Sequence, residues 1–170
     1  MNSGTLFSPE HIWVLDTSAL VQFKTIIKIN DQWNAFKRFE ELVISGSLRM
    51  PKQVVKEATN VIHPDVPGAW AAGMRKKIKP PLEPEESIVS YIMREVGNVV
   101  DSEREEDDAD PYVIALAKQL QDDGNKVSVV SNECVDYDPR ISIETACGIL
   151  NIPHIRPEQF LSSVKIHLTT

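Results

Sequence analysis

Residues 12–21, with the sequence IWVLDTSALV, constrain the fold of this chain more than any other segment. The first four form a short, continuous run of apolar and mostly β-prone residues, a pattern typical of a strand that is buried on both faces. Asp16 follows this strand directly, and a helical segment is expected from Thr17 onward. The segment therefore indicates a buried strand that ends in a carboxylate, and its meaning depends on whether other carboxylates arrive at the same place.

Further along the chain, predicted helices alternate with short strands. The helices have recognisable ends: Asp31 is a candidate N-cap, Gly46 and Gly124 are candidate C-terminal stops, and Pro51 is a candidate first residue. Strands are expected at SLRM, KVSVV and IPHI. Helices are expected at residues 31–46, 51–62, 85–96, 111–124 and 141–150, with one more inside 63–86. This alternation predicts an α/β fold, a three-layer α/β/α sandwich with a mostly parallel central sheet.

Residues at helical spacing indicate which face of a helix turns toward the core. Such spacing is clear in three of the expected helices. The residues that mark it are Trp33, Phe36, Glu40 and Val43 in the first, Val54, Val55, Ala58, Val61 and Ile62 in the second, and Ile88, Ile92, Met93 and Val96 in the third.

The composition is that of an ordinary globular protein. A chain of 170 residues is expected to form a single domain, residues 1–170, with its core at about 12–161 and a proline-rich, loop-rich insertion at about 63–86. No apolar run approaches the ~20 residues that a membrane helix needs, and the first residues resemble no secretory signal. Cys134 and Cys147 lack the spacing of a zinc motif. We therefore expect a reduced, cytoplasmic protein without a membrane partner.

Two carboxylates are expected at the same edge of the sheet. Asp16 lies directly after the strand IWVL, and Glu133 lies just beyond the strand that ends in SVV. In open α/β sheets, ligand sites form beyond the carboxyl ends of the strands. If the two strands are parallel neighbours, both acids emerge at one place.

Two more carboxylates lie on the apolar faces of predicted helices. Glu57 is three residues after Val54, and Asp110 is three residues before Val113. A carboxylate on a core-facing stripe costs free energy unless something compensates its charge. A divalent cation shared by all four acids is the simplest compensator, and carboxylate oxygens suit Mg²⁺ or Mn²⁺.

Each of these acids also has a plainer interpretation. Asp16 can cap the following helix, and Glu57 can pair with a neighbouring lysine. Asp110 ends an acidic run of a kind that is usually solvated, and Glu133 alone carries little signal. The four together carry more weight, because otherwise four independent coincidences are required.

The segments that hold these acids resemble, in order, the motifs of the PIN-domain family, the metal-dependent nuclease fold of many toxin ribonucleases. VLDTSAL is similar to its hydrophobic strand ending in Asp-Thr/Ser-Ser, and PKQVVKE resembles its Pro-x-x-Val-x-x-Glu helix start. DPYVIALA resembles the Asp that opens an Ala/Ile-rich helix. VVSNE stands where the family has a strand ending in Thr-x-Asp, so a glutamate replaces the usual aspartate. The resemblance spans about residues 12–161 and implies a PIN-like domain.

This resemblance implies an enzyme, a Mg²⁺- or Mn²⁺-dependent endoribonuclease that hydrolyses RNA phosphodiester bonds. The implied catalytic and metal-binding residues are Asp16, Glu57, Asp110 and Glu133. Thr17, Ser18 and Ser131 are expected to fix these carboxylates by hydrogen bonds, with helix capping as the alternative role. Two choices stay open: Asp136 or Asp138 can replace Glu133, and Asp108 competes with Asp110.

The expected partners follow from the same resemblance. RNA is the expected substrate, an antitoxin protein is a candidate partner, and a homodimer is expected. The net charge of −7 argues against broad binding to duplex nucleic acid, so the grip on RNA must be local. Candidate contacts for phosphate, which are otherwise ordinary surface charges, are Arg75, Lys76, Lys77, Lys79 and Arg140. Trp70 or Tyr112 are candidates for stacking on bases, although burial beneath the insertion suits Trp70 better.

Three rivals to the nuclease interpretation differ in what they require. A haloacid-dehalogenase-type phosphatase needs a second aspartate two residues after the first, where this chain has Ser18. A nucleotide-binding fold needs a glycine-rich phosphate loop, and neither common pattern occurs. The serious rival is a PIN-like protein that no longer cuts and acts as a binding or regulatory module. The acidic balance and Glu133 favour that rival, whereas the presence of Asp16, Glu57 and Asp110 opposes it.

Overall fold

A sheet of four parallel strands lies at the centre of the computed structural model, which describes residues 11–60, 65–99 and 108–167. Its strands are β1 (Ile12–Leu15), β2 (Leu48–Arg49), β3 (Val127–Val130) and β4 (His154–Ile155). The strand order is β2-β1-β3-β4, and every neighbouring pair is parallel. β1 pairs with β3 along its whole length, from Ile12 opposite Val127 to Leu15 opposite Val130.

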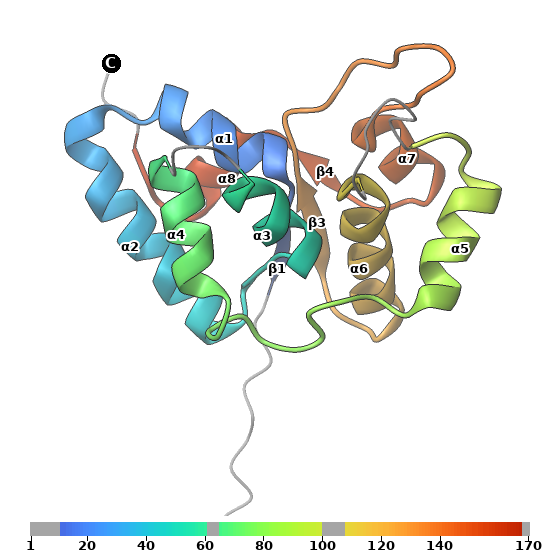
Figure 1. Cartoon of the computed structure of the whole chain (residues 1–170), viewed down its shortest axis with the longest axis horizontal. Helices are drawn as coiled ribbons and strands as arrows, with labels where there is room; N and C mark the ends of the chain where they lie inside the picture. The colour runs from blue at the N-terminus through green and yellow to red at the C-terminus, as the bar shows by residue number, and fades with distance from the viewer. Residues whose placement is uncertain (1–10, 61–64, 100–107, 168–170) are drawn as a thin grey trace, which may run out of the picture.

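Helices cover both faces of this sheet. They are α1 (Thr17–Ile26), α2 (Ile29–Ser45), α3 (Lys52–Thr59), α4 (Val66–Met74), α5 (Glu86–Glu95), α6 (Asp110–Asp122), α7 (Ile143–Ile149) and α8 (Pro157–Ser163). Figure 1 shows α1, α2, α3, α4 and α8 on one side of the strands and α5, α6 and α7 on the other. The prediction of a three-layer α/β/α sandwich with a parallel sheet is confirmed. None of the described helices is long and apolar enough to cross a membrane.

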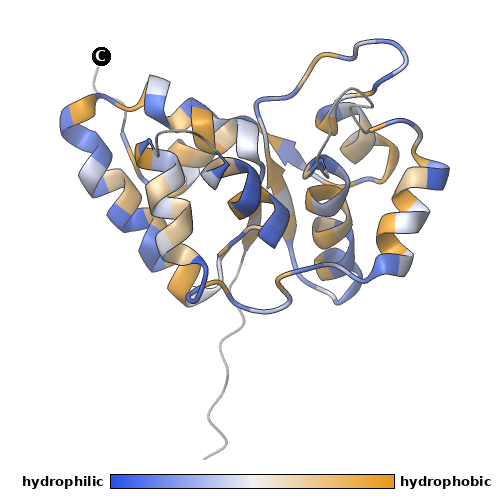
Figure 2. Cartoon of the chain, in the orientation of Figure 1, coloured by the Kyte–Doolittle hydropathy of each residue, from blue (hydrophilic) through white to orange (hydrophobic). Residues whose placement is uncertain are grey.

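The core lies between the sheet and the helices that flank it. All four residues of β3 are buried, as a central parallel strand requires. On α6, hydrophobic residues predominate along the buried turns (Figure 2), and eight of its 13 residues are buried. Phe23, Phe39 and Phe160 hold α1, α2 and α8 together, with ring centroids 4.8–5.8 Å apart. Aromatic pairs at such distances contribute about 0.5–1.5 kcal/mol each beyond their burial.

Several predicted details of the helices are wrong. Asp31 is not an N-cap, because Lys28 takes that position and α2 begins at Ile29. Pro51 is the N-cap of α3 rather than its first residue. Met93 is 41% exposed, although it was assigned to an inward face, and Trp33, which marked a turn of the expected helix, is 80% exposed.

The other residues predicted to face inward, where described, behave as expected or nearly so. Phe36, Val43, Val54, Val55, Ala58, Ile92 and Val96 are buried, and Ile88 packs against the core. Val61 and Ile62 lie outside the described residues. Helix α8 was not predicted, although Pro157 at its start and the bond from the Arg156 amide to Gln159 are ordinary helix signals.

The described part of the proline-rich insertion, from residue 65, is packed against the core, and it contains one short helix, α4, as predicted. Asp65 caps α4 by accepting a hydrogen bond from the Gly68 amide at 3.0 Å. A side chain at Gly68 would meet the Ala58 carbonyl oxygen at 2.5 Å, so glycine allows α4 to lie directly on α3. The Trp70 indole donates to the Phe36 carbonyl at 3.1 Å and packs on the core, which agrees with burial rather than base stacking.

Candidate carboxylate site at the edge of the sheet

The candidate site lies where the strand order reverses. The chain runs from β1 outward to β2 and later returns to the opposite side of β1 to form β3. In open parallel sheets this switch point, at the carboxyl ends of the strands, is where ligands bind. Asp16 follows β1 and Ser131 follows β3, and the two strands pair in register up to Leu15 and Val130. The Asp16 amide also donates to the Val130 carbonyl at 3.0 Å, so the two strand ends stay side by side.

Asp16 is both a helix cap and a member of the site. Its Oδ2 accepts hydrogen bonds from the amide and the hydroxyl of Ser18, at 3.0 and 2.5 Å, and so caps α1. The residue is 1% exposed, and its Oδ1 is buried with no hydrogen-bond partner among the described residues. The capping interpretation is therefore correct but accounts for only one of the two carboxylate oxygens.

Two serines join the ends of β1 and β3. The Ser18 and Ser131 hydroxyls lie 3.2 Å apart, and Ser131 Oγ donates to Asp16 Oδ2 at 3.4 Å. Beyond β3, the Asn132 amide donates to Ser18 Oγ at 3.0 Å, and the Glu133 amide donates to Ser131 Oγ at 2.9 Å. These contacts agree with the expected role of Ser18 and Ser131 in fixing the carboxylates.

Glu57 reaches the same edge from α3. The Thr17 hydroxyl donates to Glu57 Oε2 at 2.5 Å, which links the start of α1 to α3 as predicted. Glu57 is half-buried, and its charge lies close enough to Asp16 to contribute to raising that residue's pKa. The helical spacing therefore predicted correctly that Glu57 faces the edge of the sheet where Asp16 lies.

Arg140 lies among the remaining acids. Its Nη2 is 2.5 Å from Asp110 Oδ2, 2.8 Å from Glu133 Oε1 and 4.0 Å from Asp108 Oδ2. The alternative of an ordinary surface charge does not describe Arg140, because its guanidinium pairs with Asp110 and Glu133; its predicted contact with RNA phosphate stays a prediction. No sequence pattern indicates this pairing, since Arg140 lies in an irregular loop where no periodicity shows which way a side chain points.

Burial and crowding perturb the charges of these groups. Burial raises the pKa of Asp16 to about 6, with the charges of Glu133 and Glu57 adding to the effect and hydrogen bonds from Ser18 opposing it. Burial, followed by the charges of Asp16, Asp108 and Glu133, raises the pKa of Asp110. Burial is therefore the larger cause of both shifts in pKa, and the neighbouring carboxylates add to it.

The oxygen-only donor set suits Mg²⁺ or Mn²⁺ better than a softer metal. Besides Asp16 Oδ1, Glu133 Oε2 is buried without a hydrogen-bond partner among the described residues. Buried polar atoms normally have a partner, so the unpartnered oxygens of Asp16 and Glu133 favour a bound cation between the ends of β1 and β3. The carboxylates are not tightly gathered, however: across residues 11–60, 65–99 and 108–167, three ligand atoms come within 4.8 Å of one another only at Cys134, Glu144 and His154.

The choices left open by the sequence can now be weighed. Asp108 is buried and accepts a hydrogen bond from the Asp110 amide at 3.3 Å, so it belongs to the site beside Asp110. Asp136 accepts from the Ser142 amide at 2.7 Å and from the Thr145 hydroxyl at 3.1 Å, at the start of α7. Asp138 is exposed. Glu133, which shares Arg140 with Asp110, is therefore better placed than Asp136 or Asp138.

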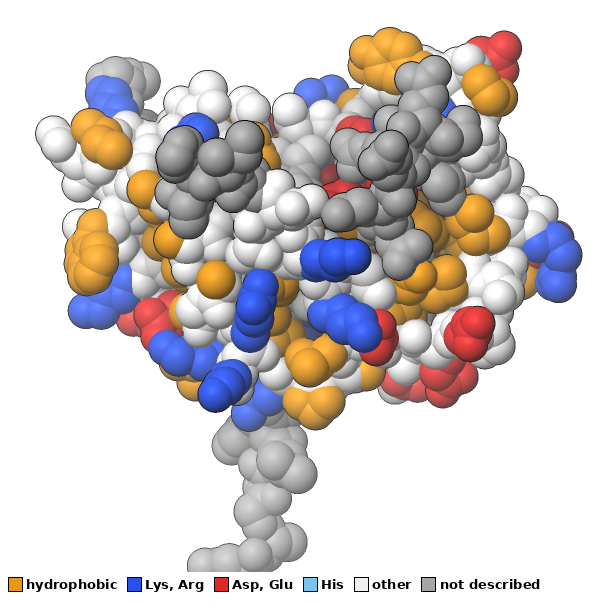
Figure 3. Space-filling model, viewed as in Figure 1, with side chains coloured by type: hydrophobic (Ala, Val, Ile, Leu, Met, Phe, Trp, Pro, Cys, Tyr) orange, Lys and Arg blue, Asp and Glu red, His pale blue; other side chains and the backbone are white. Residues whose placement is uncertain are grey.

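Basic side chains gather at a cavity beside α3. Figure 3 shows Lys and Arg side chains over α3 and the end of α4. The cavity has a volume of about 520 Å³ and is lined by Lys52, Gln53, Val55, Lys56, Arg75, Ile78 and Leu82. Of the predicted RNA contacts, Arg75 lines this cavity, and Lys76 and Lys79 are exposed. Lys77 forms an ion pair with Glu40. Lys52 and Lys56 were not among the predicted contacts.

The fold and this edge define an α/β protein with a carboxylate-lined switch point. The family model described as Domain of unknown function (DUF4411) matches residues 13–168, nearly the whole chain. The protein therefore belongs to the DUF4411 family. A search of curated proteins found no significant match.

Proposed function

We propose that this protein is a Mg²⁺- or Mn²⁺-dependent endoribonuclease that hydrolyses RNA phosphodiester bonds. The observation that supports this most is the electrostatic proximity of four acids from separate segments. The charges of Glu57 and Glu133 act on Asp16, and Arg140 pairs with both Asp110 and Glu133. The unpartnered buried oxygens of Asp16 and Glu133 favour a ligand there. The resemblance of the same segments to PIN-domain motifs points to the same chemistry.

The electrostatic balance of the site leaves room for a cation. Asp16, Asp110 and Glu133 are buried or half-buried, whereas the guanidinium of Arg140 carries a single positive charge. Buried carboxylates that remain uncompensated are costly, which is also why the pKa values of Asp16 and Asp110 are raised. A divalent cation bound there would supply Lewis acidity, a water of lowered pKa and charge compensation for the phosphate.

The protein residues would have distinct roles in this reaction. Asp16, Glu57, Asp110 and Glu133 would hold the cation. Thr17, Ser18 and Ser131 would keep the carboxylates of Glu57 and Asp16 in place through the hydrogen bonds described above. Arg140, which pairs with Asp110 and Glu133, would bind a phosphate oxygen of the RNA beside them, because a guanidinium suits that contact.

The cavity beside α3 is the best candidate for holding the RNA strand. Lys56 and Arg75 bring positive charge to its rim, where Lys52 is paired with Glu83. Val55, Ile78 and Leu82 supply apolar surface. Lys56 directly precedes Glu57, so the cavity adjoins the carboxylate site along α3. Cations that follow a backbone next to apolar surface for bases are the usual means of holding single-stranded nucleic acid.

A second function, a PIN-like binding or regulatory module that no longer cuts, is favoured by one observation. Arg140 pairs with both Asp110 and Glu133, and an internal cation of this kind can replace a metal permanently. In that case the carboxylates would have a structural role, and added Mn²⁺ would have no site.

Thermal unfolding with and without Mn²⁺ separates the two functions. The nuclease is expected to gain about 2.7 kcal/mol of stability at a free Mn²⁺ concentration of about 100 times Kd, because only the folded state binds the ion. Asp16→Asn is expected to lose this gain, whereas Asp123→Asn at the exposed end of α6 keeps it. An unchanged melting temperature of the parent at all Mn²⁺ concentrations would favour the module.

The remaining expectations belong to the same proposal. A toxin of this class would act in the cytoplasm and slow growth when expressed without its antitoxin. A homodimer is expected, and the exposed Ile29 and Trp33 on α2 offer apolar surface for such a contact. Light scattering of the purified protein tests the dimer, and co-expression with the product of an adjacent gene tests the antitoxin.

A further inference from the structure

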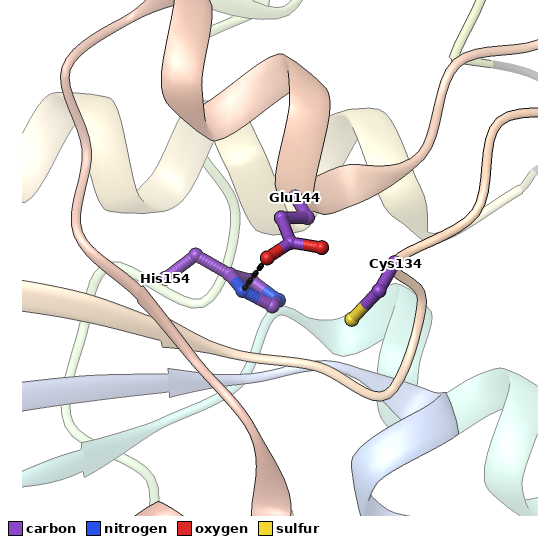
Figure 4. Close-up of side chains that lie close together, drawn as sticks. All are labelled: Cys134, Glu144 and His154. Carbon is purple, nitrogen blue, oxygen red and sulfur yellow. Dashed lines mark ion pairs between the residues drawn. The ribbon is translucent and has the colours of Figure 1, made fainter.

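A second cluster of potential metal ligands lies beside the carboxylate site but is separate from it. Cys134, Glu144 and His154 each offer a ligand atom, and these atoms all lie within 4.8 Å of one another. Figure 4 shows the three side chains converging from the loop after β3, from α7 and from β4. His154 Nδ1 is 3.9 Å from Glu144 Oε1. In a tetrahedral zinc site neighbouring ligand atoms lie roughly 3.3–3.8 Å apart, so only small side-chain adjustments are needed.

The histidine provides an independent sign of a ligand. Its side chain is only 7% exposed, and its Nε2 is buried with no hydrogen-bond partner among the described residues. A buried imidazole nitrogen without a partner is uncommon, because desolvation of a polar atom must be compensated. Burial also lowers the pKa of His154, which keeps the ring in the neutral form that metals bind.

The thiol and the carboxylate complete a donor set for a borderline-soft metal. Cys134 comes from the loop after β3 and Glu144 from the first turn of α7, and their ligand atoms lie within 4.8 Å of each other. A thiolate, a carboxylate and a neutral imidazole carry two negative charges, which matches a divalent ion.

We propose that Cys134, Glu144 and His154 form a binding site for Zn²⁺ or a similar thiophilic divalent ion, distinct from the oxygen site of Asp16 and Glu133. Sulfur and nitrogen donors select zinc, whereas all-oxygen sets select Mg²⁺ or Mn²⁺. Binding exchanges the thiol proton for the metal and releases that proton to solvent. Three protein ligands leave one position for water.

The site would tie together three segments of the chain by their side chains, in addition to the backbone bonds from the Glu144 amide to Glu133 and from the Ser131 amide to Ile155. Cys134 belongs to the loop between β3 and α7, the long loop that arches over the upper right of Figure 1, and this loop also carries Glu133 and Arg140. Glu144 lies in the first turn of α7, and His154 lies in the edge strand β4. An ion held by all three would fix the loop that brings Arg140 to the carboxylates.

Cobalt substitution tests the proposal on the full-length protein. Co²⁺ bound to a thiolate gives a charge-transfer absorption in the near ultraviolet, which an all-oxygen site cannot give. The reduced parent protein is expected to show this absorption on titration with Co²⁺ and to lose it when Zn²⁺ is added. Cys134→Ser should abolish it, and Glu144→Gln should weaken Co²⁺ binding by more than the roughly 10–100-fold cost of losing an outer-shell partner.

The chain provides a matched control for the thiol. Cys147 is the other cysteine, and it is fully buried in α7, where burial raises its pKa to about 12. Cys147→Ala is expected to keep the absorption. Glu144 is half exposed, so its variant should fold normally even if Cys134→Ser does not. A parent without the absorption, or an absorption that survives in folded Cys134→Ser, overturns the proposal.

The outcome is independent of the proposed nuclease. Asp16→Asn removes a carboxylate of the oxygen site and is expected to leave the cobalt absorption unchanged. A protein that shows the absorption but cleaves no RNA therefore supports the zinc site and contradicts the nuclease. A protein that cleaves RNA but shows no absorption supports the nuclease and contradicts the zinc site.

Discussion

Glu133 and Cys134 are consecutive residues of one loop, yet their side chains belong to two different clusters. The Glu133 carboxylate joins an oxygen-rich site that contains the guanidinium of Arg140. The Cys134 thiol joins a sulfur, nitrogen and oxygen cluster with Glu144 and His154. The first cluster forms at the switch point of the sheet between β1 and β3, and the second forms between β4 and α7.

The difference between the clusters lies in how their charges are compensated. In the first, acids outnumber the cation that pairs with them, so burial raises the pKa of Asp16 and Asp110. In the second, neutral thiol and imidazole groups surround one half-exposed carboxylate, so little charge is buried until a proton leaves. The oxygen cluster therefore holds buried, partly uncompensated negative charge in the folded protein, whereas the sulfur cluster becomes negatively charged only when it binds a ligand.

The largest expected effect is that of Asp16→Asn on the oxygen cluster. Asparagine keeps the helix cap of α1, because its side-chain oxygen can accept from Ser18, but it removes the negative charge. RNA cleavage is expected to fall by about a hundredfold or more, the size seen when a charge-stabilising group is removed from an active site. Cleavage of a labelled single-stranded RNA in Mn²⁺ measures this. Undiminished cleavage by a purified Asp16→Asn, Asp110→Asn double variant would refute the site.

The next largest effect is expected from removing the guanidinium of Arg140 from the oxygen cluster. Arg140→Met removes the guanidinium that pairs with Asp110 and Glu133. Leaving these carboxylates without their partner costs about 3 kcal/mol, the low end for a buried pair, because Arg140 and Glu133 are partly exposed. For a chain of this size that corresponds to a drop in melting temperature of roughly 6–12 °C. Because the acids then have a greater need for a cation, Mn²⁺ should stabilise the variant more than the parent.

Arg38→Met is the matched control for this change. Arg38 pairs with Glu41 on the exposed surface of α2, where an ion pair contributes about 0–1 kcal/mol. If Arg140→Met is as stable as Arg38→Met, the carboxylates of the oxygen cluster do not need the positive charge of Arg140. If it is less stable but indifferent to Mn²⁺, the carboxylates form the metal-free module.

Much of the fold was predictable because it depends on local patterns. The apolar runs of β1 and β3 and the glycines that end α2 and α6 are properties of short segments, and they indicated a parallel sheet between helices. Glu57 and Asp110 were placed at the site by helical spacing, which persists after the helix packs. Trp33 shows the limit: helical spacing alone does not say how wide the buried face of α2 is, and Trp33 lies beyond it.

The parts of the two clusters that were missed depend on loops and on pairing between distant segments. Arg140 reaches Asp110 because the loop turns back through the backbone pairing of Tyr137 with Arg140 and through Asp136 binding the Ser142 amide. Neither contact follows a sequence period. The sulfur cluster joins residues 134, 144 and 154 from three elements. It therefore lacks the closely spaced cysteine pair by which zinc motifs are usually recognised in a sequence.

A smaller effect is expected at the basic cavity next to the oxygen cluster. Lys56→Ala with Arg75→Ala removes two cations from its rim. If each contacts one phosphate of a single strand, each loss lowers the slope of log K against log salt by about 0.7. Binding of an uncleavable RNA analogue at several salt concentrations measures this slope. Lys37→Ala with Arg38→Ala makes the same charge change on the exposed face of α2 and should leave the slope unchanged. If both double variants show the same slope, RNA does not bind along the cavity.

The smallest effect tests whether the two clusters are separate in function as well as in chemistry. Cys134→Ser is expected to leave Mn²⁺ stabilisation within about twofold in Kd, because sites that share no ligand couple weakly and a serine hydroxyl keeps the size of the thiol. Glu133 keeps its bond to the Ser131 hydroxyl and its ion pair with Arg140 in that variant. Calorimetric titration with Mn²⁺, with excess Zn²⁺ present and absent, measures the coupling. A large loss of Mn²⁺ affinity in folded Cys134→Ser would mean that the loop acts as one unit and that the two clusters form a single binuclear site.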